Sequence, residues 1–384
     1  MNETRSHRHS MSILTWPRRM RIVACLGVAI ALGAATGAQG QSRALPADAE
    51  KIVQSATRQV STWGGPETGP AGVTGKSIAV LAEDLRNGGI VGVAQGIREA
   101  ARAIGWKIKV FDAAGTAGGR DKAAADALAA APDGLIVVGA DAKAMQARLQ
   151  TFARRGIPMV GWHVGPEAGP MANSPVAMNV STDPVEVARI TALSAVVASG
   201  GRAGVVIFTD SNYEIAMIKA KAMAYVIRAC PQCTLLEIRD VAISRNAELM
   251  PEVTRELLAR HGPRWTHALA INDIYFDYAV PELIKGGLPS DGLSLMSAGD
   301  GSAAAFLRIQ ARTFQTATVA EPLNLHGWQL VDELNRLLAR QPVSGYVIPV
   351  HLVTSDNVAF DGGPRLQFDP DNGYRDIYRR IWQR

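Results

Sequence analysis

The side chains best able to do chemistry in this chain stand directly after short apolar runs. Seven such runs are followed by polar or aromatic groups, namely Glu83, Asp84 and Asn87; Trp162 and His163; Ser181, Thr182 and Asp183; Asp210, Asn212 and Tyr213; Asn272 and Asp273; Asp300; and Glu321. Carboxylates and carboxamides form hydrogen bonds in fixed directions, which suits a ligand with several hydroxyl groups. An aromatic ring offers an apolar face on which a sugar ring can lie.

Each of these residues also has a structural interpretation. Asp, Asn, Ser and Thr are common helix caps and turn residues, and any single one is a cap more often than a ligand contact. Seven strand ends that converge on one cleft nevertheless favour a binding site over seven independent caps.

The elements that would position these groups alternate along the chain. The apolar runs are interpreted as buried parallel strands at Ser77–Leu81, Trp106–Phe111, Gly134–Val138, Pro158–Gly161, Gly204–Phe208, His267–Ile271 and Leu293–Ser297. Alanine-rich amphipathic segments between most of them are long enough for crossover helices. This alternation predicts an α/β fold with a mostly parallel sheet, in which ligands bind beyond the carboxyl ends of the strands.

Residues 1–40 have the features of a secretory signal peptide. Arg18, Arg19 and Arg21 precede an apolar run, Ile22–Ala35, which small residues follow. The run is too short to span a membrane, so we expect export to the periplasm with cleavage near residues 38–41; a buried first helix is the alternative. Removing residues 1–40 takes away five basic and one acidic side chain, which leaves a net charge of +1 and gives no support to nucleic-acid binding.

The mature chain keeps two cysteines, Cys230 and Cys233, in the run Ala-Cys-Pro-Gln-Cys. An even pair in an oxidising compartment favours a disulfide. A redox-active pair would need its thiolate at a helix N-terminus, whereas this pair follows the helical run Ile218–Ala229, where the helix dipole disfavours a thiolate. We therefore expect a structural disulfide with a modest contribution to stability.

Both ends of the mature chain lie outside the α/β pattern. Residues 41–75 are expected to form a short helix or arm followed by the Gly- and Pro-rich connector Thr62–Gly75. Residues 361–384 are expected to form a helical tail packed on the body, with one apolar face made of Tyr374, Ile377, Tyr378, Ile381 and Trp382.

Catalytic and metal-binding motifs are missing from the sequence. It has no P-loop, no G-x-S-x-G and no H-E-x-x-H, and none of His163, His261, His267, His326 and His351 stands at metal-ligand spacing from another. We expect neither a metal nor a cofactor, and a binding protein instead of an enzyme.

Four segments resemble type I periplasmic binding proteins of the ribose/galactose class, the substrate-binding subunits of ABC importers. They are SIAVLAEDLRNGGIVGVAQGIREAARAIGW, APDGLIVVGADAKAMQARLQTFARRGIPMVGW, ALAINDIYFDYAVPELIKGG and LMSAGDGSAAAFLRIQARTFQTATVAEPLNLHGWQLVDEL. The resemblance covers roughly residues 76–357. It implies two Rossmann-like doubly wound lobes joined by a three-stranded hinge, with crossings near residues 180, 301 and 347.

The resemblance also implies the domains, partners and site. The N-terminal lobe would hold residues 76–180 and 302–346, and the C-terminal lobe residues 181–301 and 347–360. A monomer would bind a small polar ligand, most simply a sugar or polyol, and deliver it to a membrane permease. The family's binding positions fall on Asn87, Lys219, Arg245, Asn272, Asp273, Asp300 and Glu321.

The chain departs from the family pattern after its first strand. Gly88, Gly89 and Ile90 stand where many members have aromatic residues, and His163 stands where sugar binders usually have Asp. Trp162, Tyr213 or Tyr275 would then supply the stacking ring. Lys219, Arg245 and His163 would tolerate an anionic ligand such as a sugar acid, whereas Asp183, Asp300 and Glu321 would resist one.

Two other functions remain open from the sequence. A periplasmic sensory protein that signals to a membrane receptor kinase would have the same fold and cleft. An exported α/β hydrolase would need a nucleophile and a base, for which His163 near Ser181 or Asp183 is the only candidate. The export signal and the absence of an N-terminal helix-turn-helix exclude a transcriptional regulator.

Overall fold

The structure is a computed structural model that describes residues 48–59 and 61–383. The predicted signal peptide, residues 1–40, lies outside the described residues. None of the helices in these two ranges is both long and apolar enough to cross a membrane.

The first lobe is built on a six-stranded sheet with the order β2-β1-β3-β4-β6-β5. Its strands are β1 (Ser77–Ala82), β2 (Lys107–Asp112), β3 (Gly134–Val138), β4 (Met159–Trp162), β5 (Gly169–Pro170) and β6 (Met178–Val180). All neighbours are parallel except β5 and β6. The central strand β3 is buried along its whole length, as its uninterrupted apolar sequence predicts.

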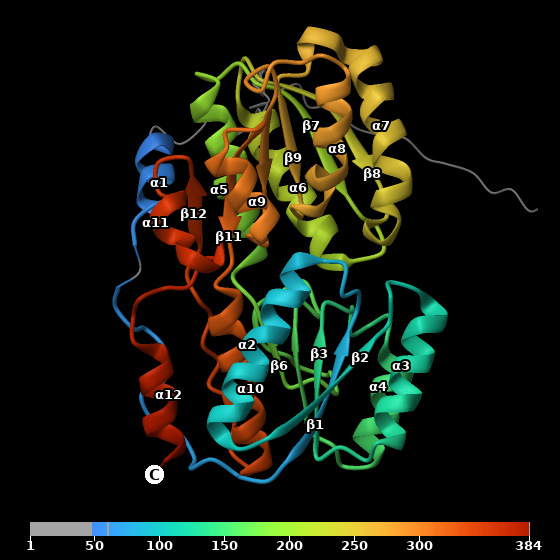
Figure 1. The fold of residues 1–384 in the computed structure, drawn as a ribbon, viewed down its shortest axis with the longest axis vertical. Helices are drawn as coiled ribbons and strands as arrows, with labels where there is room; N and C mark the ends of the chain where they lie inside the picture. The colour runs from blue at the N-terminus through green and yellow to red at the C-terminus, as the bar shows by residue number, and fades with distance from the viewer. Residues whose placement is uncertain (1–47, 60, 384) are drawn as a thin grey trace, which may run out of the picture. The chain divides into compact units, whose positions relative to one another are not determined.

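Helices cover both faces of this sheet. On one side α2 (Gly88–Ile104) lies beside α10 (Leu323–Leu338), as Figure 1 shows, and the other side carries α3 (Ala117–Ala129) and α4 (Gln146–Arg154). The contact of α2 with α10 is close because it pairs Gly96 with Gly327. A Cβ on Gly327 would lie 2.4 Å from the backbone carbonyl carbon of Gly96.

The second lobe has a six-stranded sheet with the order β12-β11-β10-β9-β7-β8. Its strands are β7 (Gly204–Thr209), β8 (Thr234–Asp240), β9 (His267–Ala270), β10 (Ser294–Ser297), β11 (Gln315–Ala320) and β12 (His351–Thr354). Only β12 runs antiparallel to its neighbour.

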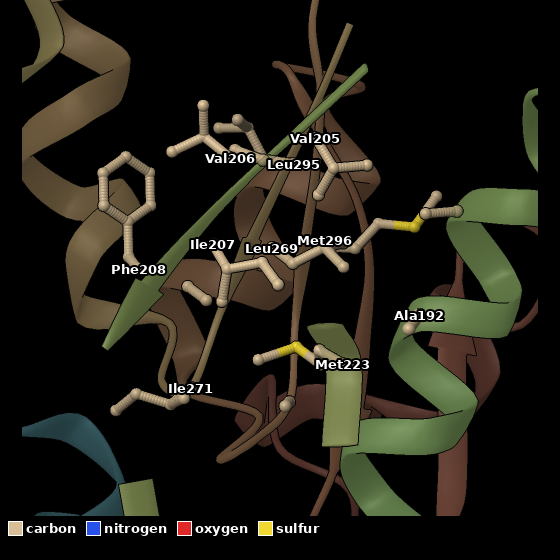
Figure 2. Packing of buried hydrophobic residues seen from close by; sticks show 14 of the residues in the cluster. Ala192, Val205, Val206, Ile207, Phe208, Met223, Leu269, Ile271, Leu295 and Met296 are labelled. Carbon is tan, nitrogen blue, oxygen red and sulfur yellow. The ribbon is translucent and has the colours of Figure 1, made fainter. Parts of the chain in front are cut away.

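Helices also flank the second sheet. They are α5 (Pro184–Ala198), α6 (Glu214–Ala229), α7 (Asn246–His261), α8 (Ile274–Lys285) and α9 (Ala303–Gln310), with short 3₁₀ turns at Ile243–Arg245 and Gly262–Arg264. Figure 2 shows the core of this lobe, where Val205–Phe208 of β7 meet side chains of β9 and β10 as well as Met223 and Ala192 from α6 and α5.

All seven strands predicted from apolar runs are strands in the structure. The predicted position of the second crossing, near residue 301, is wrong. The strand β11 pairs with β10 and β12, so residues 302–320 belong to the second lobe and the chain crosses after Ala320. The other two crossings follow β6 and precede β12.

The two ends of the described chain contact both lobes. α1 (Ala49–Ala56) packs on α5 and β12 of the second lobe, whereas Trp63 and Val73 contact the first lobe. After α11 (Val358–Asp361) and a 3₁₀ turn at Gly363–Arg365, α12 (Tyr374–Trp382) packs on the first lobe. The predicted apolar face of this tail is confirmed, because its aromatic residues join the first lobe's core. Cys230 and Cys233 are joined by a disulfide.

Candidate functional site

A cleft lined by both lobes lies at the carboxyl ends of the strands. It contains about 590 Å³ of space not occupied by atoms, part of it open to solvent. Its lining residues are Glu83, Asp84, Asn87, Ile90, Gly139, Trp162 and His163 from the first lobe, and Tyr213, Ile215, Ala216, Lys219, Ile243, Ser244, Ile271, Asn272 and Asp300 from the second. They follow β1, β3, β4, β7, β8, β9 and β10, as the topology of parallel sheets requires.

Asp300 is the carboxylate in this lining with the fewest internal partners. Asn272 Nδ2, 2.6 Å from Asp300 Oδ2, is the one donor to it among the described residues. The side chain lies against Gly89, where a Cβ would come within 2.1 Å of Asp300 Oδ2, so glycine is required there. Burial raises the pKa of Asp300, although the charges of His163 and Lys219 oppose the shift.

Glu321 lies behind the lining and holds two of its residues. Its Oε2 is 2.8 Å from His163 Nε2, and its Oε1 is 3.9 Å from Lys219 Nζ. Burial alone would raise the pKa of Glu321, but the charge and hydrogen bond of His163 and the charge of Lys219 outweigh burial and lower it. We call Asp300, Glu321, Lys219, His163 and Asn272 the cleft floor.

Trp162 and His326 support the cleft floor from the first lobe. The Trp162 indole stacks on the His163 ring, with 3.7 Å between the ring centroids, and its Nε1 donates to His326 Nδ1 at 3.0 Å. This bond places the proton of neutral His326 on Nε2. Burial lowers the pKa of His326 to about 4, so this histidine is uncharged at neutral pH.

The mouth of the cleft is closed by contacts between the lobes. The Tyr213 hydroxyl donates to Glu83 Oε1 at 3.0 Å, and Arg86 donates to the backbone oxygen of Ser244 at 3.3 Å. The exposed ion pair of Lys143 with Glu214 adds a third contact. The carboxylates here are already paired, Glu83 with Arg120 and Asp84 with Arg86.

Seven of the predicted site residues line the cleft: Asn87, Trp162, His163, Tyr213, Lys219, Asn272 and Asp300. Of the three candidate stacking rings, Tyr275 is outside the lining, because it lies fully buried in the second lobe's core and donates to the backbone oxygen of Val241.

Four other predicted residues serve local structure away from the cleft. Asp183 caps α5 by accepting from Val185 and Glu186, and Asn212 bonds to Asp210 within a turn. Arg245 pairs with Glu248 on the surface. Asp273 accepts from the backbone of Gly301 and Ser302 and from Gln315, which fixes the turn that carries Asp300.

The apolar part of the lining was not predicted. Ile90, Ile215, Ile243 and Ile271 all border the cleft. In the sequence these isoleucines are indistinguishable from core residues. The arginine that pairs with Glu83 gives no local signal either, since Arg120 comes from a helix 37 residues away, whereas Arg86 stands two residues after its partner Asp84.

Among the described residues, the serine–histidine pair considered for a hydrolase is not formed, and the cleft floor suits a metal ion poorly. Ser181 Oγ donates to the backbone oxygen of Thr182 and Asp183 is used as a cap, so neither pairs with His163 as a hydrolase would require. Within the described residues, His163, Asp300 and Glu321 bring possible metal ligands within 4.8 Å of one another. The Lys219 ammonium already supplies positive charge to Glu321, and a divalent cation would be repelled by it.

Solved structures share this fold at low sequence identity. A subunit of an ABC sugar transporter from Rhodobacter sphaeroides is 20% identical at a TM-score of 0.63, over 74% of this chain and 100% of its own. An Agrobacterium vitis solute-binding protein with bound α-D-tagatopyranose is 16% identical with a TM-score of 0.68, and the match covers 77% of this chain and 99% of that protein. A Thermotoga lettingae protein in complex with 5-methylthioribose is 15% identical with a TM-score of 0.66, and the match covers 79% of this chain and 93% of that protein.

No curated protein sequence matches the chain. A family model described as a periplasmic binding protein domain matches residues 78–342, which contain most of both lobes and all the residues that line the cleft. The chain therefore belongs to the periplasmic binding protein family.

Proposed function

We propose that this chain is the solute-binding subunit of an ABC importer and that it binds a sugar or polyol in the cleft. The basic and apolar segments before residue 40 support export to the periplasm. Proteins of the same fold bind tagatopyranose and 5-methylthioribose, which supports a polyhydroxylated ligand.

The single observation that carries this proposal is the incomplete hydrogen bonding of the Asp300 carboxylate. Its carboxylate faces a cleft shared by both lobes and has one internal donor among the described residues. Two neighbouring hydroxyl groups would supply the donors that an ionised carboxylate lacks. Asn272 and Lys219, which also line the cleft, would bond the same hydroxyl oxygens from the other side.

The charges of the cleft floor favour a neutral ligand. Asp300 and Glu321 face the ammonium of Lys219 and the His163 ring, whose charge contributes to the lowered pKa of Glu321, and His326 behind them is uncharged. The positive groups of the cleft floor are thus already engaged by its two carboxylates, so an anionic ligand would meet those carboxylates with no further positive charge to offset them. Arg245, which would have favoured an anion, is exposed and pairs with Glu248.

Binding would couple to closure of the lobes. A ligand held by Asn87 and His163 from one lobe and by Asn272 and Asp300 from the other makes its full set of contacts only when the lobes meet. It would therefore bind the closed form more tightly than the open form and shift the population toward it. The closed surface is what a membrane permease would recognise.

The test is to identify what the protein binds. Mass spectrometry of small molecules released from the purified mature protein would be paired with a thermal-shift screen of sugars, polyols and sugar acids. A ligand at 100 times its Kd adds about 2.7 kcal/mol to stability, so binding gives a clear rise in Tm. We expect a neutral sugar or polyol. Capture of a charged ligand, with no neutral sugar or polyol raising Tm, would contradict the proposal.

A further inference from the structure

We propose that Glu321 is a positioning residue, which holds the His163 ring so that the second ring nitrogen, Nδ1, binds a hydroxyl group of the ligand. This assignment rests on the proposed function and gives two residues of the same site their separate roles. The family resemblance implies that Glu321 itself binds the ligand. In the structure, however, Glu321 lies behind the lining of the cleft, whereas His163 is part of that lining.

The His163 ring is fixed by two neighbours. Its Nε2 is 2.8 Å from Glu321 Oε2, and the Trp162 indole stacks on one face of the ring with 3.7 Å between the centroids. The lowered pKa of Glu321 keeps its carboxylate ionised, so the carboxylate oxygen accepts from Nε2 and a proton stays on that nitrogen. Turning the ring over would break this hydrogen bond, and the position of Nδ1 is therefore fixed as well.

Nδ1 of His163 is the ring nitrogen left for a ligand. It has no hydrogen bond to a described residue and, unlike the unpaired ring nitrogens of His261, His326 and His351, it is not buried. The residue as a whole is only 9% exposed and it lines the cleft, so the accessible edge of the ring opens on the cleft. A hydroxyl group suits this position because it can both donate and accept a hydrogen bond.

His351 in the second lobe has the same arrangement without access to the cleft. Its Nε2 is 2.8 Å from Asp361 Oδ2, and the Phe368 ring stacks on it with 4.1 Å between the centroids. Its Nδ1 is buried without a hydrogen bond to a described residue, and none of these three residues lines the cleft. A carboxylate and a stacked ring are thus compatible with a purely structural histidine. Access to Nδ1 is what distinguishes His163.

Two further observations favour a binding role for His163. Its backbone φ is +52°, a left-handed conformation that is unfavourable for most residues with a Cβ and that is enriched at binding sites. One of its ring nitrogens also lies within 4.8 Å of a carboxylate oxygen of Asp300, which belongs to the other lobe. Hydrogen bonds of about 2.8 Å to one hydroxyl group, or to two neighbouring ones, can span this separation. The ligand would then be held by both lobes at this point.

Two substitutions of His163 separate the roles of its nitrogens. By its length, the amide of His163→Asn ends near the position of Nδ1, whereas the amide of His163→Gln reaches the position of Nε2 and can still bond to Glu321. Calorimetry would measure binding of D-allose, D-tagatose and allitol. We expect His163→Gln to lose about tenfold or more in affinity, and His163→Asn to bind at least about threefold more tightly than His163→Gln. Equal binding, or tighter binding by the glutamine variant, would overturn the proposal.

The role of Glu321 is tested by a matched pair of variants. Glu321→Gln should weaken binding of the same probes about threefold or more, because the amide can donate as well as accept and no longer holds the His163 ring in one state. Asp361→Asn removes the corresponding carboxylate from His351, which is away from the cleft, and should change affinity by less than about twofold. Equal effects of the two variants would show that Glu321 has no role in positioning a ligand contact.

A measurement without ligand separates this proposal from the proposed function. With isotope-labelled histidine, long-range proton–nitrogen NMR spectra report which ring nitrogen carries a proton. We expect a proton on Nε2 of both His163 and His351, and in Glu321→Gln a change at His163 alone. A wild-type spectrum with the His163 proton only on Nδ1 would overturn the positioning role whether or not a sugar binds. Failure of every sugar and polyol to bind the wild-type protein would instead overturn the proposed function itself.

Discussion

The cleft floor and the aromatic cluster under the C-terminal helix are both buried, yet they are made of opposite kinds of side chain. The cleft floor contains two carboxylates, a lysine and a histidine. The aromatic cluster consists of Trp63, Trp328, Tyr374, Tyr378 and Trp382, with the rings of Trp328 and Trp382 stacked at 5.4 Å. Both regions join segments that are far apart in the sequence.

The two regions differ in the kind of polar atom that is left unpaired. In the aromatic cluster, Trp382 Nε1 donates to Asp332 and Trp328 Nε1 donates to Glu99, and a neutral group, the Tyr378 hydroxyl, has no hydrogen bond to a described residue. On the cleft floor, Glu321 Oε1 has no hydrogen bond to a described residue, and Asp300 is held by a single donor. Paired aromatic contacts stabilise the fold, whereas incompletely paired charges cost stability and leave capacity for a ligand.

The largest effect is expected from Trp328→Ala, which tests the stabilising side of this comparison. Trp328 is fully buried at the centre of the aromatic cluster, so its removal should lower the free energy of unfolding by about 3–5 kcal/mol. Urea unfolding measures this loss, and Trp328→Phe should recover part of it. Ligand affinity of the folded protein should stay unchanged. A large loss of affinity without loss of stability would show that the two regions are not separate.

Asp300→Ala tests the binding side. Loss of a charged hydrogen-bond acceptor should weaken ligand binding by about 1.5–3 kcal/mol. The free energy of unfolding should stay constant or rise, since a buried charge is removed. Calorimetry with the identified ligand measures the first effect and urea unfolding the second.

Asp183→Ala is the matched control for this variant. Asp183 was predicted at the site by the same reasoning but caps α5. Its loss should cost about 1 kcal/mol of stability and no affinity. If Asp183→Ala instead weakened ligand binding and Asp300→Ala only lowered stability, then Asp183 would be the ligand contact and Asp300 the structural residue.

A smaller effect is expected from pH, and stability and ligand affinity should change in opposite directions as the pH falls. Burial raises the pKa of Asp300 to about 6 from 3.8, so between these values the folded state binds more protons than the unfolded state. Stability from this group therefore rises as pH falls from 7 toward 4. Ligand affinity should fall about tenfold from pH 7 to pH 5, because the ionised acceptor is lost.

Asp300→Asn serves as the control for pH. This variant should remove both slopes, which calorimetry and urea unfolding at each pH would measure. Glu321 does not interfere in this range, since its lowered pKa keeps it ionised. An affinity that stays constant from pH 7 to pH 5 in the wild-type protein would exclude Asp300 as an ionised acceptor.

The fold follows from local sequence more completely than the site does. Strands such as Gly134–Val138 are buried on both faces, so their apolar runs identify them without knowledge of their neighbours. The sheet to which a strand belongs cannot be read from the strand's own residues. Nothing within Gln315–Ala320 shows that it pairs with β10 and β12, and the crossing between the lobes was therefore predicted too early in the chain.

Prediction of the site from the sequence is limited for the same reason, because the role of each residue depends on contacts between distant segments. An aspartate after a strand is a cap or a ligand contact depending on what faces it, so Asp183 and Asp300 could not be separated in the sequence. The pairing of Glu83 with Arg120 and the exposure of Ile243 to the cleft depend on contacts between distant segments. Polar candidates can thus be found from strand ends, but their availability requires the three-dimensional structure.

The smallest effect is expected at the mouth, where two contacts between the lobes differ in burial. Tyr213 donates to Glu83 in a partly buried position, whereas Lys143 and Glu214 form an exposed ion pair. Tyr213→Phe should weaken ligand binding by about 0.5–1.5 kcal/mol, because a hydrogen bond of the closed form is lost while Arg120 still pairs with Glu83. Lys143→Ala should change affinity by less than about 0.5 kcal/mol, since water screens an exposed pair. Stopped-flow fluorescence would place the Tyr213 effect in a faster dissociation rate. An equal effect of both variants would mean that burial does not set the strength of these contacts.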